Sequence, residues 1–246
     1  MAEDPTATGD RLQQLIEKYT PAPLNQVVNI ASAYAQNEWK NEQWSFLIGG
    51  RVDKNSIMDK AVFSPRANIR YNPTQDVNIR FSYAEGFRAP QAFDEDLHIS
   101  NVGGELVSIV RAKDLKEERS RSFNASVDWY HYFGDFQANL LVEGFYTKLS
   151  DPFVLTPPVK DPDGSAYLIQ TRINGSGAKV YGGTLEGKVA YKDKVQLQAG
   201  LTLQRSIYDS PEEWSADEEH LSEKERYSDK ILRTPDVYGY LQLPIC

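Results

Sequence analysis

Apolar and polar residues alternate strictly in two segments between residues 63 and 90, and this pattern constrains the fold more than any other. In the first segment the apolar positions hold Phe63, Pro65, Ala67, Ile69 and Tyr71. In the second they hold Val77, Ile79, Phe81 and Tyr83. Because side chains along a strand point alternately to opposite faces, the pattern predicts two strands with one apolar and one polar face. The turn-forming residues 72–76 predict that these strands form a hairpin.

The polar positions of this hairpin are rich in arginine. Arg66, Arg70 and Arg80 take polar positions within it, and Arg88 continues the series at its end. A wall that is apolar on one side and polar on the other is typical of a transmembrane β-barrel. A soluble β-sandwich produces the same alternation, so the hairpin alone leaves both folds open.

Seven further runs of the same kind predict an all-β chain. With the two halves of the hairpin, the nine predicted strands include residues 27–40, 43–54, 117–133, 136–149, 179–192, 195–204 and 230–243. Most of these runs exceed the roughly 9–11 residues with which a tilted strand crosses a bilayer. They also exceed the length of roughly five to six residues that is usual for strands in soluble proteins. Long strands therefore favour the membrane barrel.

The connections between these runs alternate in length. Short turns are expected at residues 41–42, 72–76, 134–135 and 192–194, and longer connections at residues 55–60, 89–116, 150–178 and 209–229. An up-and-down meander in a membrane sorts its connections in this way, whereas a Greek-key sandwich has no reason to. Aromatic residues beside the short turns predict one girdle at a membrane interface: Trp39, Trp44, Tyr71, Phe133, Phe136 and Tyr191.

The composition excludes several other classes of protein. The chain has 246 residues, of which 40% are hydrophobic, and no stretch approaches the roughly 18 uncharged apolar residues of a membrane helix. A net charge of −8 argues against nucleic-acid binding. The single Cys246 permits neither a disulfide framework nor a zinc cluster. We also find no nucleophile–base triad, so the sequence predicts no catalytic residues, no enzyme, no metal site and no cofactor.

Four segments resemble the barrel of TonB-dependent outer-membrane receptors. They read EWKNEQWSFLIGGRVDKNS, VFSPRANIRYNPTQDVNIRFSYAEGFRAPQAFDED, LKEERSRSFNASVDW and LVEGFYTKLSD, and RTPDVYGY resembles a late barrel strand. The resemblance runs in order from about Tyr34 to Tyr240, and its most specific element is SYAEGFRAP followed by a long loop and ERS. It implies a 22-stranded barrel closed by an N-terminal plug domain. It also implies import of a siderophore, cobalamin, haem or oligosaccharide across the Gram-negative outer membrane, using energy from TonB.

The chain shows about nine of those 22 strands and no plug, TonB box, signal peptide or terminal aromatic strand. We therefore expect residues 27–246 to form part of a receptor barrel, and residues 1–26 to be a polar segment with a short helix or loop remnant at 11–19. The implied partners are outer-membrane lipid, the plug domain of the parent receptor, TonB through the missing N-terminal part, and a small nutrient. The alternative function is a soluble all-β binding module, for example for carbohydrate.

Candidate site residues follow from the alternation. The residues expected to face the lumen are Arg66, Arg70, Arg80, Arg88, Gln137, Asn139, Gln196 and Gln198. The residues expected to face away from it are Leu140, Val142, Leu197, Ala199 and Leu201. The arginines could bind the plug or an anionic substrate, but lumen arginines more often pair with acidic residues of neighbouring strands.

Two loops contain further candidates. Trp214 and Tyr227 could contact a ligand, although an ordinary charged loop is the more common explanation. Asp94, Glu95, Asp96 and His98 have oxygen-rich spacing suited to calcium. A solvated acidic loop is the preferred interpretation of that segment, since no glycine-turn signature accompanies it.

Overall fold

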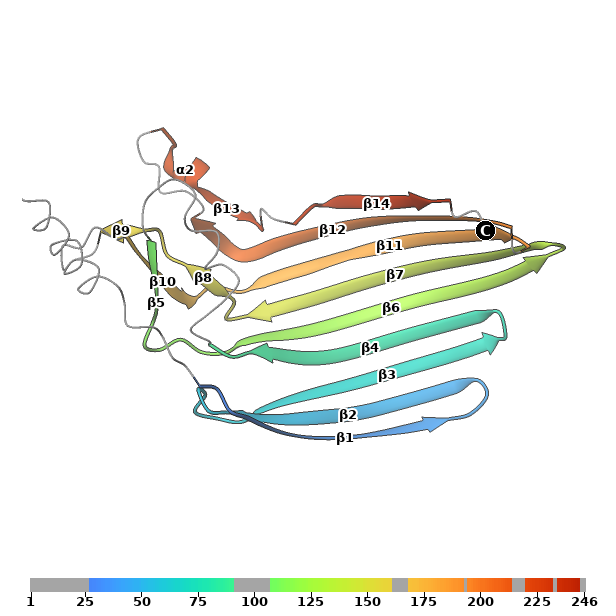
Figure 1. Ribbon diagram of the computed structural model, residues 1–246, viewed down its shortest axis with the longest axis horizontal. Coiled ribbons are helices and arrows are strands. Elements are labelled where there is room, and N and C mark those ends of the chain that lie inside the picture. Colours follow the sequence, from blue (N-terminus) through green and yellow to red (C-terminus); the bar gives the residue numbers. More distant parts are fainter. Residues whose placement is uncertain are drawn as a thin grey trace, which may run out of the picture.

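Ten strands form one large antiparallel sheet, here called the main sheet (Figure 1). The computed structural model describes residues 27–90, 107–160, 168–192, 194–213, 220–231 and 234–243. The strands of the main sheet are β1 (Ile30–Lys40), β2 (Trp44–Asn55), β3 (Val62–Thr74), β4 (Val77–Arg88), β6 (Glu118–Phe133), β7 (Phe136–Ser150), β11 (Ala178–Tyr191), β12 (Val195–Glu213), β13 (Tyr227–Lys230) and β14 (Val237–Gln242). The helix expected at residues 11–19 lies outside the described residues.

Each strand of the main sheet pairs with the next one along it, in the order β1-β2-β3-β4-β6-β7-β11-β12. β13 and β14 both pair with β12, so the ten strands occupy nine positions across the sheet. Among the described residues, β1 pairs only with β2 and β14 only with β12, so both are edge strands and the sheet is open. The all-β, up-and-down meander predicted from the sequence is confirmed, including its two edges.

The short turns lie together at one end of the main sheet (Figure 1). At the β1–β2 turn, the Asn41 side chain accepts hydrogen bonds from the backbone N–H groups of Gln43 and Trp44 at 2.9 and 2.7 Å. The β6–β7 turn needs a left-handed residue, and Gly134 supplies it with φ of 60°. Lys192 in the β11–β12 turn forms an ion pair with Asp135 at 3.0 Å, which ties neighbouring turns together.

The long connections lie at the opposite end and contain a second, smaller sheet (Figure 1). It consists of β5 (Val107–Arg111), β8 (Phe153–Leu155), β9 (Val159–Lys160) and β10 (Leu168–Asn174). β10 pairs in parallel with β5 and antiparallel with β8 and β9. These segments were expected to be loops, because strands of two to seven residues are too short for alternation to identify.

Of the last predicted strand, residues 230–243, the structure forms β14 at 237–242, whereas β13 shares only residue 230 with it and lies mostly in the segment 209–229 that was expected to be a loop. Pro235 lies between β13 and β14 and has no N–H with which to continue a ladder. Its carbonyl instead accepts a hydrogen bond of 2.9 Å from the Gln204 side chain. The break before β14 therefore has a local cause that period-two alternation does not report.

Helix is almost absent from the described part of the chain. The one α-helix there, α2 (Glu223–Arg226), has four residues, and none is long and apolar enough to cross a membrane. Buried apolar residues are also few: Met58, Val62, Ala89 and Ala178. The second sheet lies beyond one end of the main sheet and covers neither face of its middle strands (Figure 1). A soluble sandwich, in contrast, buries one face of each sheet against the other.

Candidate functional site

The strand register places all eight lumen candidates on one face of the main sheet, here called the polar face. Residues that lie directly opposite each other in neighbouring strands share a face. Arg70 lies opposite Arg80, and Arg80 opposite Ser126. Farther along, Lys188 lies opposite both Asn139 and Gln198. The same register and the two-residue spacing place the remaining candidates on this face: Arg66, Arg88, Gln137 and Gln196.

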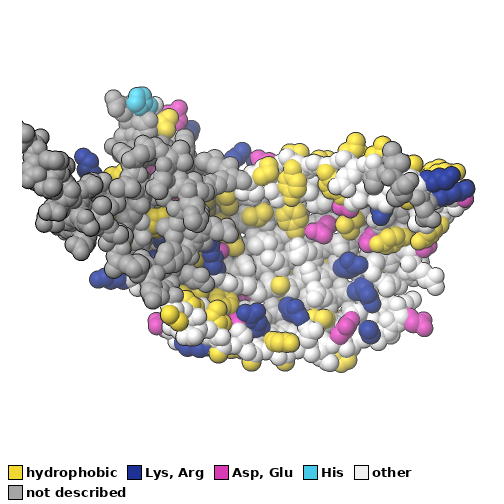
Figure 2. Space-filling view, in the orientation of Figure 1, with side chains coloured by type: hydrophobic (Ala, Val, Ile, Leu, Met, Phe, Trp, Pro, Cys, Tyr) yellow, Lys and Arg dark blue, Asp and Glu magenta, His cyan; other side chains and the backbone are white. Residues whose placement is uncertain are grey.

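The five residues expected to point away from the lumen occupy the other face, here called the apolar face. Leu185 of β11 lies opposite Val142 on one side and Leu201 on the other. Leu140, Leu197 and Ala199 follow at two-residue spacing. On the face of the main sheet shown in Figure 2, charged side chains lie among white polar ones, and hydrophobic side chains gather mainly along its margins. That distribution is the one expected for the polar face.

Aromatic residues bound the apolar face at two levels. Phe133, Phe136 and Tyr191 lie in register beside the short turns, and their rings are 5.4 and 4.8 Å apart. An upper aromatic row lies ten residues farther along each of the same three strands: Phe123, Tyr146 and Tyr181. Between the two rows, none of the apolar-face residues on β6, β7 and β11 is Asp, Glu, Lys or Arg.

The distance between these aromatic rows corresponds to a bilayer. Ten residues at about 3.3 Å each extend about 33 Å along a strand. Strands of membrane barrels are tilted by roughly 35–45°, which converts that length to about 25 Å of depth. The apolar band of outer-membrane barrels is also about 25 Å tall. The apolar face therefore has the dimensions of a lipid-facing barrel wall.

Hydrogen bonds link neighbouring strands across the polar face. The Asn139 side chain donates to the carboxylate of Asp128, which is 8% exposed and also accepts from the Tyr130 hydroxyl at 3.0 Å. Gln198 donates to Glu186 at 2.8 Å and contacts the Tyr240 hydroxyl at 2.9 Å. The side chains of Asn139 and Gln198, two of the lumen candidates, are therefore bonded to side chains of neighbouring strands of the main sheet.

Arg70 and Arg80 lie directly opposite each other on β3 and β4. Among the described residues neither forms an ion pair with a carboxylate, and the buried Nε of Arg70 has no hydrogen-bond partner. Both line a groove of about 430 Å³ on the polar face. The commoner role considered for these residues, pairing with acidic neighbours, is therefore not what the described structure shows. Like charges directly opposite each other in a sheet are destabilising.

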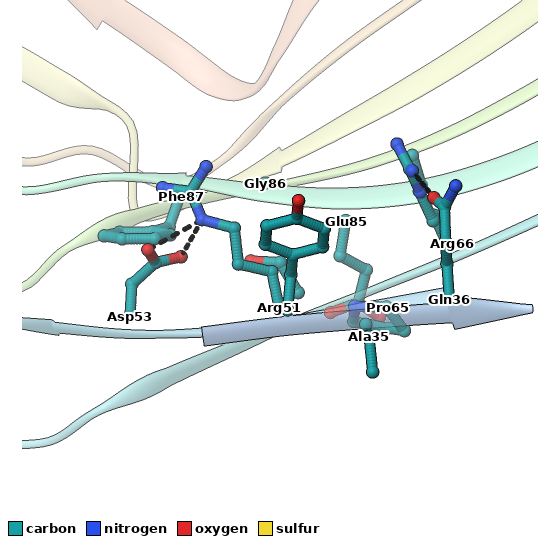
Figure 3. A pocket seen from close by; sticks show the side chains of 13 residues that line it. Ala35, Gln36, Arg51, Asp53, Pro65, Arg66, Glu85, Gly86 and Phe87 are labelled. Carbon is teal, nitrogen blue, oxygen red and sulfur yellow. Dashed lines mark hydrogen bonds and ion pairs between the residues drawn. The ribbon is translucent and has the colours of Figure 1, made fainter. Parts of the chain in front are cut away.

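A second groove, of about 500 Å³, lies between β1, β2, β3 and β4 (Figure 3). In it the Arg51 Nε donates to both carboxylate oxygens of Asp53 at 2.7 and 2.8 Å, and the Ser32 hydroxyl donates to Asp53 at 2.5 Å. The Asp53 side chain is 1% exposed, whereas that of Arg51 is 56% exposed. Arg66 donates to Gln36 in the same groove.

Arg51 and Asp53 were not among the site residues expected from the sequence. The signal was present, because both take the polar positions of a strand whose apolar positions include Ile48 and Val52. The carboxylate is fully engaged by Arg51 and Ser32, so the free donors of the Arg51 guanidinium are the groups available to a ligand.

The remaining candidates are dispersed. Arg88 lies over the ring of Phe153 at 5.5 Å, which connects the main sheet to the second sheet. Tyr227 is 41% exposed in β13, while Trp214 and the acidic residues 94–98 lie outside the described residues. Within the described ranges, no group of three or more His, Cys, Asp or Glu side chains could hold a metal ion.

The family described as "TonB dependent receptor-like, beta-barrel" matches residues 5–241. The chain belongs to this family. The family consists of outer-membrane receptors and transporters and is not a family of enzymes, as the sequence resemblance implied. A search of the curated proteins finds no match to the chain.

Solved structures of the family share the fold. The siderophore receptor PirA from Pseudomonas aeruginosa has a TM-score of 0.61 and 17% identity, covering 73% of this chain and 34% of its own. The FrpB iron transporter from Neisseria meningitidis has a TM-score of 0.55 and 15% identity, and the match covers 84% of this chain and 30% of the transporter. PirA from Acinetobacter baumannii has a TM-score of 0.55 and 18% identity, covering 74% and 28%. The chain thus spans about a third of the length of these receptors.

Proposed function

We propose that this chain supplies part of the wall and the external loops of an outer-membrane receptor that imports iron as an anionic chelate. The observation that carries the proposal is the apolar face, whose aromatic rows lie ten residues apart with no Asp, Glu, Lys or Arg between them on three neighbouring strands. In this arrangement the apolar face contacts lipid and the polar face lines the lumen. The plug domain and TonB are the protein partners of the whole receptor.

Two observations support iron chelates among the nutrients considered. The similar structures are of siderophore receptors and an iron transporter by their own descriptions. In addition, Arg70 and Arg80 offer two adjacent positive charges with no carboxylate partner among the described residues. Guanidinium groups bind anionic oxygen ligands through charge-assisted hydrogen bonds. Iron held by catecholates carries such oxygens and a net negative charge, whereas an oligosaccharide has no comparable charge.

The test uses the complete receptor that carries this segment, expressed in Gram-negative cells without their own iron-chelate receptors. Uptake of ⁵⁵Fe loaded on a catecholate siderophore is measured for the native receptor and for Arg70→Gln/Arg80→Gln. Hydrogen bonds to charged groups are worth about 1.5–3 kcal/mol, so the double variant should lose apparent affinity by about ten-fold or more.

The matched control is Lys188→Gln, which removes a positive charge from the polar face of β11, three strands from Arg80, and should leave uptake unchanged. Native affinity in the double variant would exclude the arginine pair as the chelate site. Absence of the receptor from the outer-membrane fraction would exclude the barrel itself.

A further inference from the structure

Positive charges form a row across the apolar face, immediately beyond the upper aromatic row. Arg121 of β6, Lys148 of β7 and Lys179 of β11 lie directly opposite one another in register. Each is two residues beyond an aromatic residue of the upper row: Phe123, Tyr146 and Tyr181. On β12 the residue opposite Lys179 is Ile207, and Arg205 lies opposite Tyr181, level with the upper aromatic row and two residues nearer the apolar band. Arg121, Lys148 and Lys179 are called the cationic row.

The cationic row contains more positive charge than its neighbours compensate. Arg121 is 3.4 Å from Glu85 and Lys179 is 3.1 Å from Asp209, so each of these two residues has one acidic neighbour. Lys148, at the centre, and Arg205 are exposed and have no acidic partner among the described residues. Like charges directly opposite in a sheet are destabilising. Three of them side by side on a chain with a net charge of −8 therefore call for a bound anion.

Arg119, a neighbouring cation on the apolar face, has its charge balanced by an adjacent carboxylate. Arg119 also lies beyond the upper aromatic row, but its Nη2 donates to Glu117 at 2.8 Å. Partial burial raises the pKa of Glu117, but the hydrogen bonds from Arg119 have the larger effect. The pKa of Glu117 therefore lies below its usual value. Arg119 is thus neutralised within the chain, whereas the centre of the cationic row is not.

The position of the row identifies the anion. Aromatic side chains concentrate where a bilayer's hydrocarbon ends and its headgroups begin. Two residues beyond the aromatic row is about 7 Å along the strand, which is the headgroup layer. The long connections lie at this same end of the main sheet (Figure 1). In an outer-membrane barrel that end is extracellular.

We infer that the cationic row binds the phosphate groups of a phosphorylated lipid in the outer leaflet. Phosphate oxygens accept charge-assisted hydrogen bonds from Arg and Lys, and the lipid's chains lie against the apolar face below. The ligand is a membrane lipid and not a soluble anion, because the row continues directly into the lipid-facing band. This inference rests on the proposed barrel function, since it needs the apolar face to contact a bilayer.

The complete receptor, purified in non-ionic detergent, is titrated with diphosphoryl lipid A, with its dephosphorylated form and with inorganic phosphate, and bound ligand is measured by native mass spectrometry. Each basic residue near a charged membrane surface is worth about 1 kcal/mol. Arg121→Gln and Lys148→Gln should each weaken diphosphoryl lipid A binding about five-fold, and the double variant roughly thirty-fold. The dephosphorylated lipid should bind the native receptor about as weakly as the phosphorylated lipid binds the double variant.

Two controls accompany the titration. Lys188→Gln removes the same charge from the polar face of β11 and should leave lipid binding unchanged, and Lys148→Arg keeps the charge and should bind normally. Native binding by the double variant, or equal binding of the dephosphorylated lipid, would overturn the inference. So would inorganic phosphate binding as tightly as the lipid. A failure of the barrel proposal looks different, because the receptor would then be missing from the outer-membrane fraction and all variants would be affected alike.

Discussion

The two faces of the main sheet share one backbone but handle polar groups in opposite ways. On the polar face, side chains of neighbouring strands bond to each other, as Thr184 does with Thr202 at 3.0 Å and Ser122 with Thr147 at 2.9 Å. On the apolar face of β6, β7 and β11, the band between the aromatic rows contains no Asp, Glu, Lys or Arg. Leu185, in the middle of that band, is 51% exposed.

This difference indicates what surrounds each face. Soluble monomers rarely expose apolar patches larger than a few hundred Å², so a band of this width needs a hydrocarbon solvent. Polar groups such as the exposed side chain of Arg80 need water or a polar partner instead. The alternation of apolar and polar residues therefore places hydrocarbon on one face of the main sheet and water on the other. A change on one face can be compared with a matched change on the other face.

The largest effect concerns the chain by itself. Purified without detergent, residues 1–246 should aggregate, because the apolar face is uncovered and the edge strands β1 and β14 have unpaired backbone groups. Light scattering and size-exclusion chromatography measure this, and detergent should reduce the aggregation. A monodisperse, cooperatively melting monomer in plain buffer would instead mark the chain as a soluble β domain.

A single charge on the apolar face should be the next most costly change. Leu201 lies opposite Leu185, midway between the aromatic rows, so Leu201→Arg in the intact receptor should cost about 2–4 kcal/mol of folding free energy in a bilayer. Gln198→Arg, on the polar face of the same strand, should cost far less because lumen charges stay hydrated. Denaturant titration in lipid vesicles compares the two variants. Equal losses would mean that the faces are assigned wrongly.

Removing a buried acceptor from the polar face should cost less than placing a charge in lipid. Asp128 is 8% exposed and accepts hydrogen bonds from Asn139 and Tyr130. Asp128→Ala leaves both donors without this partner and should cost about 1–3 kcal/mol in the same titration. Ser126→Ala, two residues away on the same face, should cost no more than about 0.5 kcal/mol. Similar costs for both variants would show that the network contributes no stability.

The fold could be predicted from the sequence wherever a strand was long enough to repeat its pattern. β12 alternates Leu197, Ala199 and Leu201 with polar residues, and this fixes both the strand and its faces. β9 has two residues and β8 three, so their pairing with β10 depends on contacts distant in sequence that alternation does not contain. Pro235 was visible in the sequence, but its effect on the last strand was not anticipated.

The candidate site was predictable only one strand at a time. Alternation places Arg70 and Arg80 on the polar side of their own strands, but register puts them opposite each other and leaves Glu143 two strands from Arg80. Two strands are about 10 Å apart, which explains why the expected pairing with acidic neighbours does not form there. The cationic row could not be predicted for the same reason. The register of the strands, which the turns set, places Lys148 between Arg121 and Lys179, and alternation within one strand does not contain that register.

The smallest effect tests the turn that sets this register. Gly134 has φ of 60° and no atom within 4 Å of where a Cβ would be, so its requirement is conformational and not steric crowding. Gly134→Ala should cost about 1–2 kcal/mol, because a side chain disfavours the left-handed region, and Gly134→Asn should cost less, since Asn tolerates it. Gly187→Ala is the matched control: its Cβ would also meet nothing within 4 Å. It adds a methyl group to the apolar face and should change stability by less than about 0.5 kcal/mol. If both alanine variants lose stability equally, the β6–β7 turn does not depend on a left-handed residue, and another contact must fix the register of the two faces.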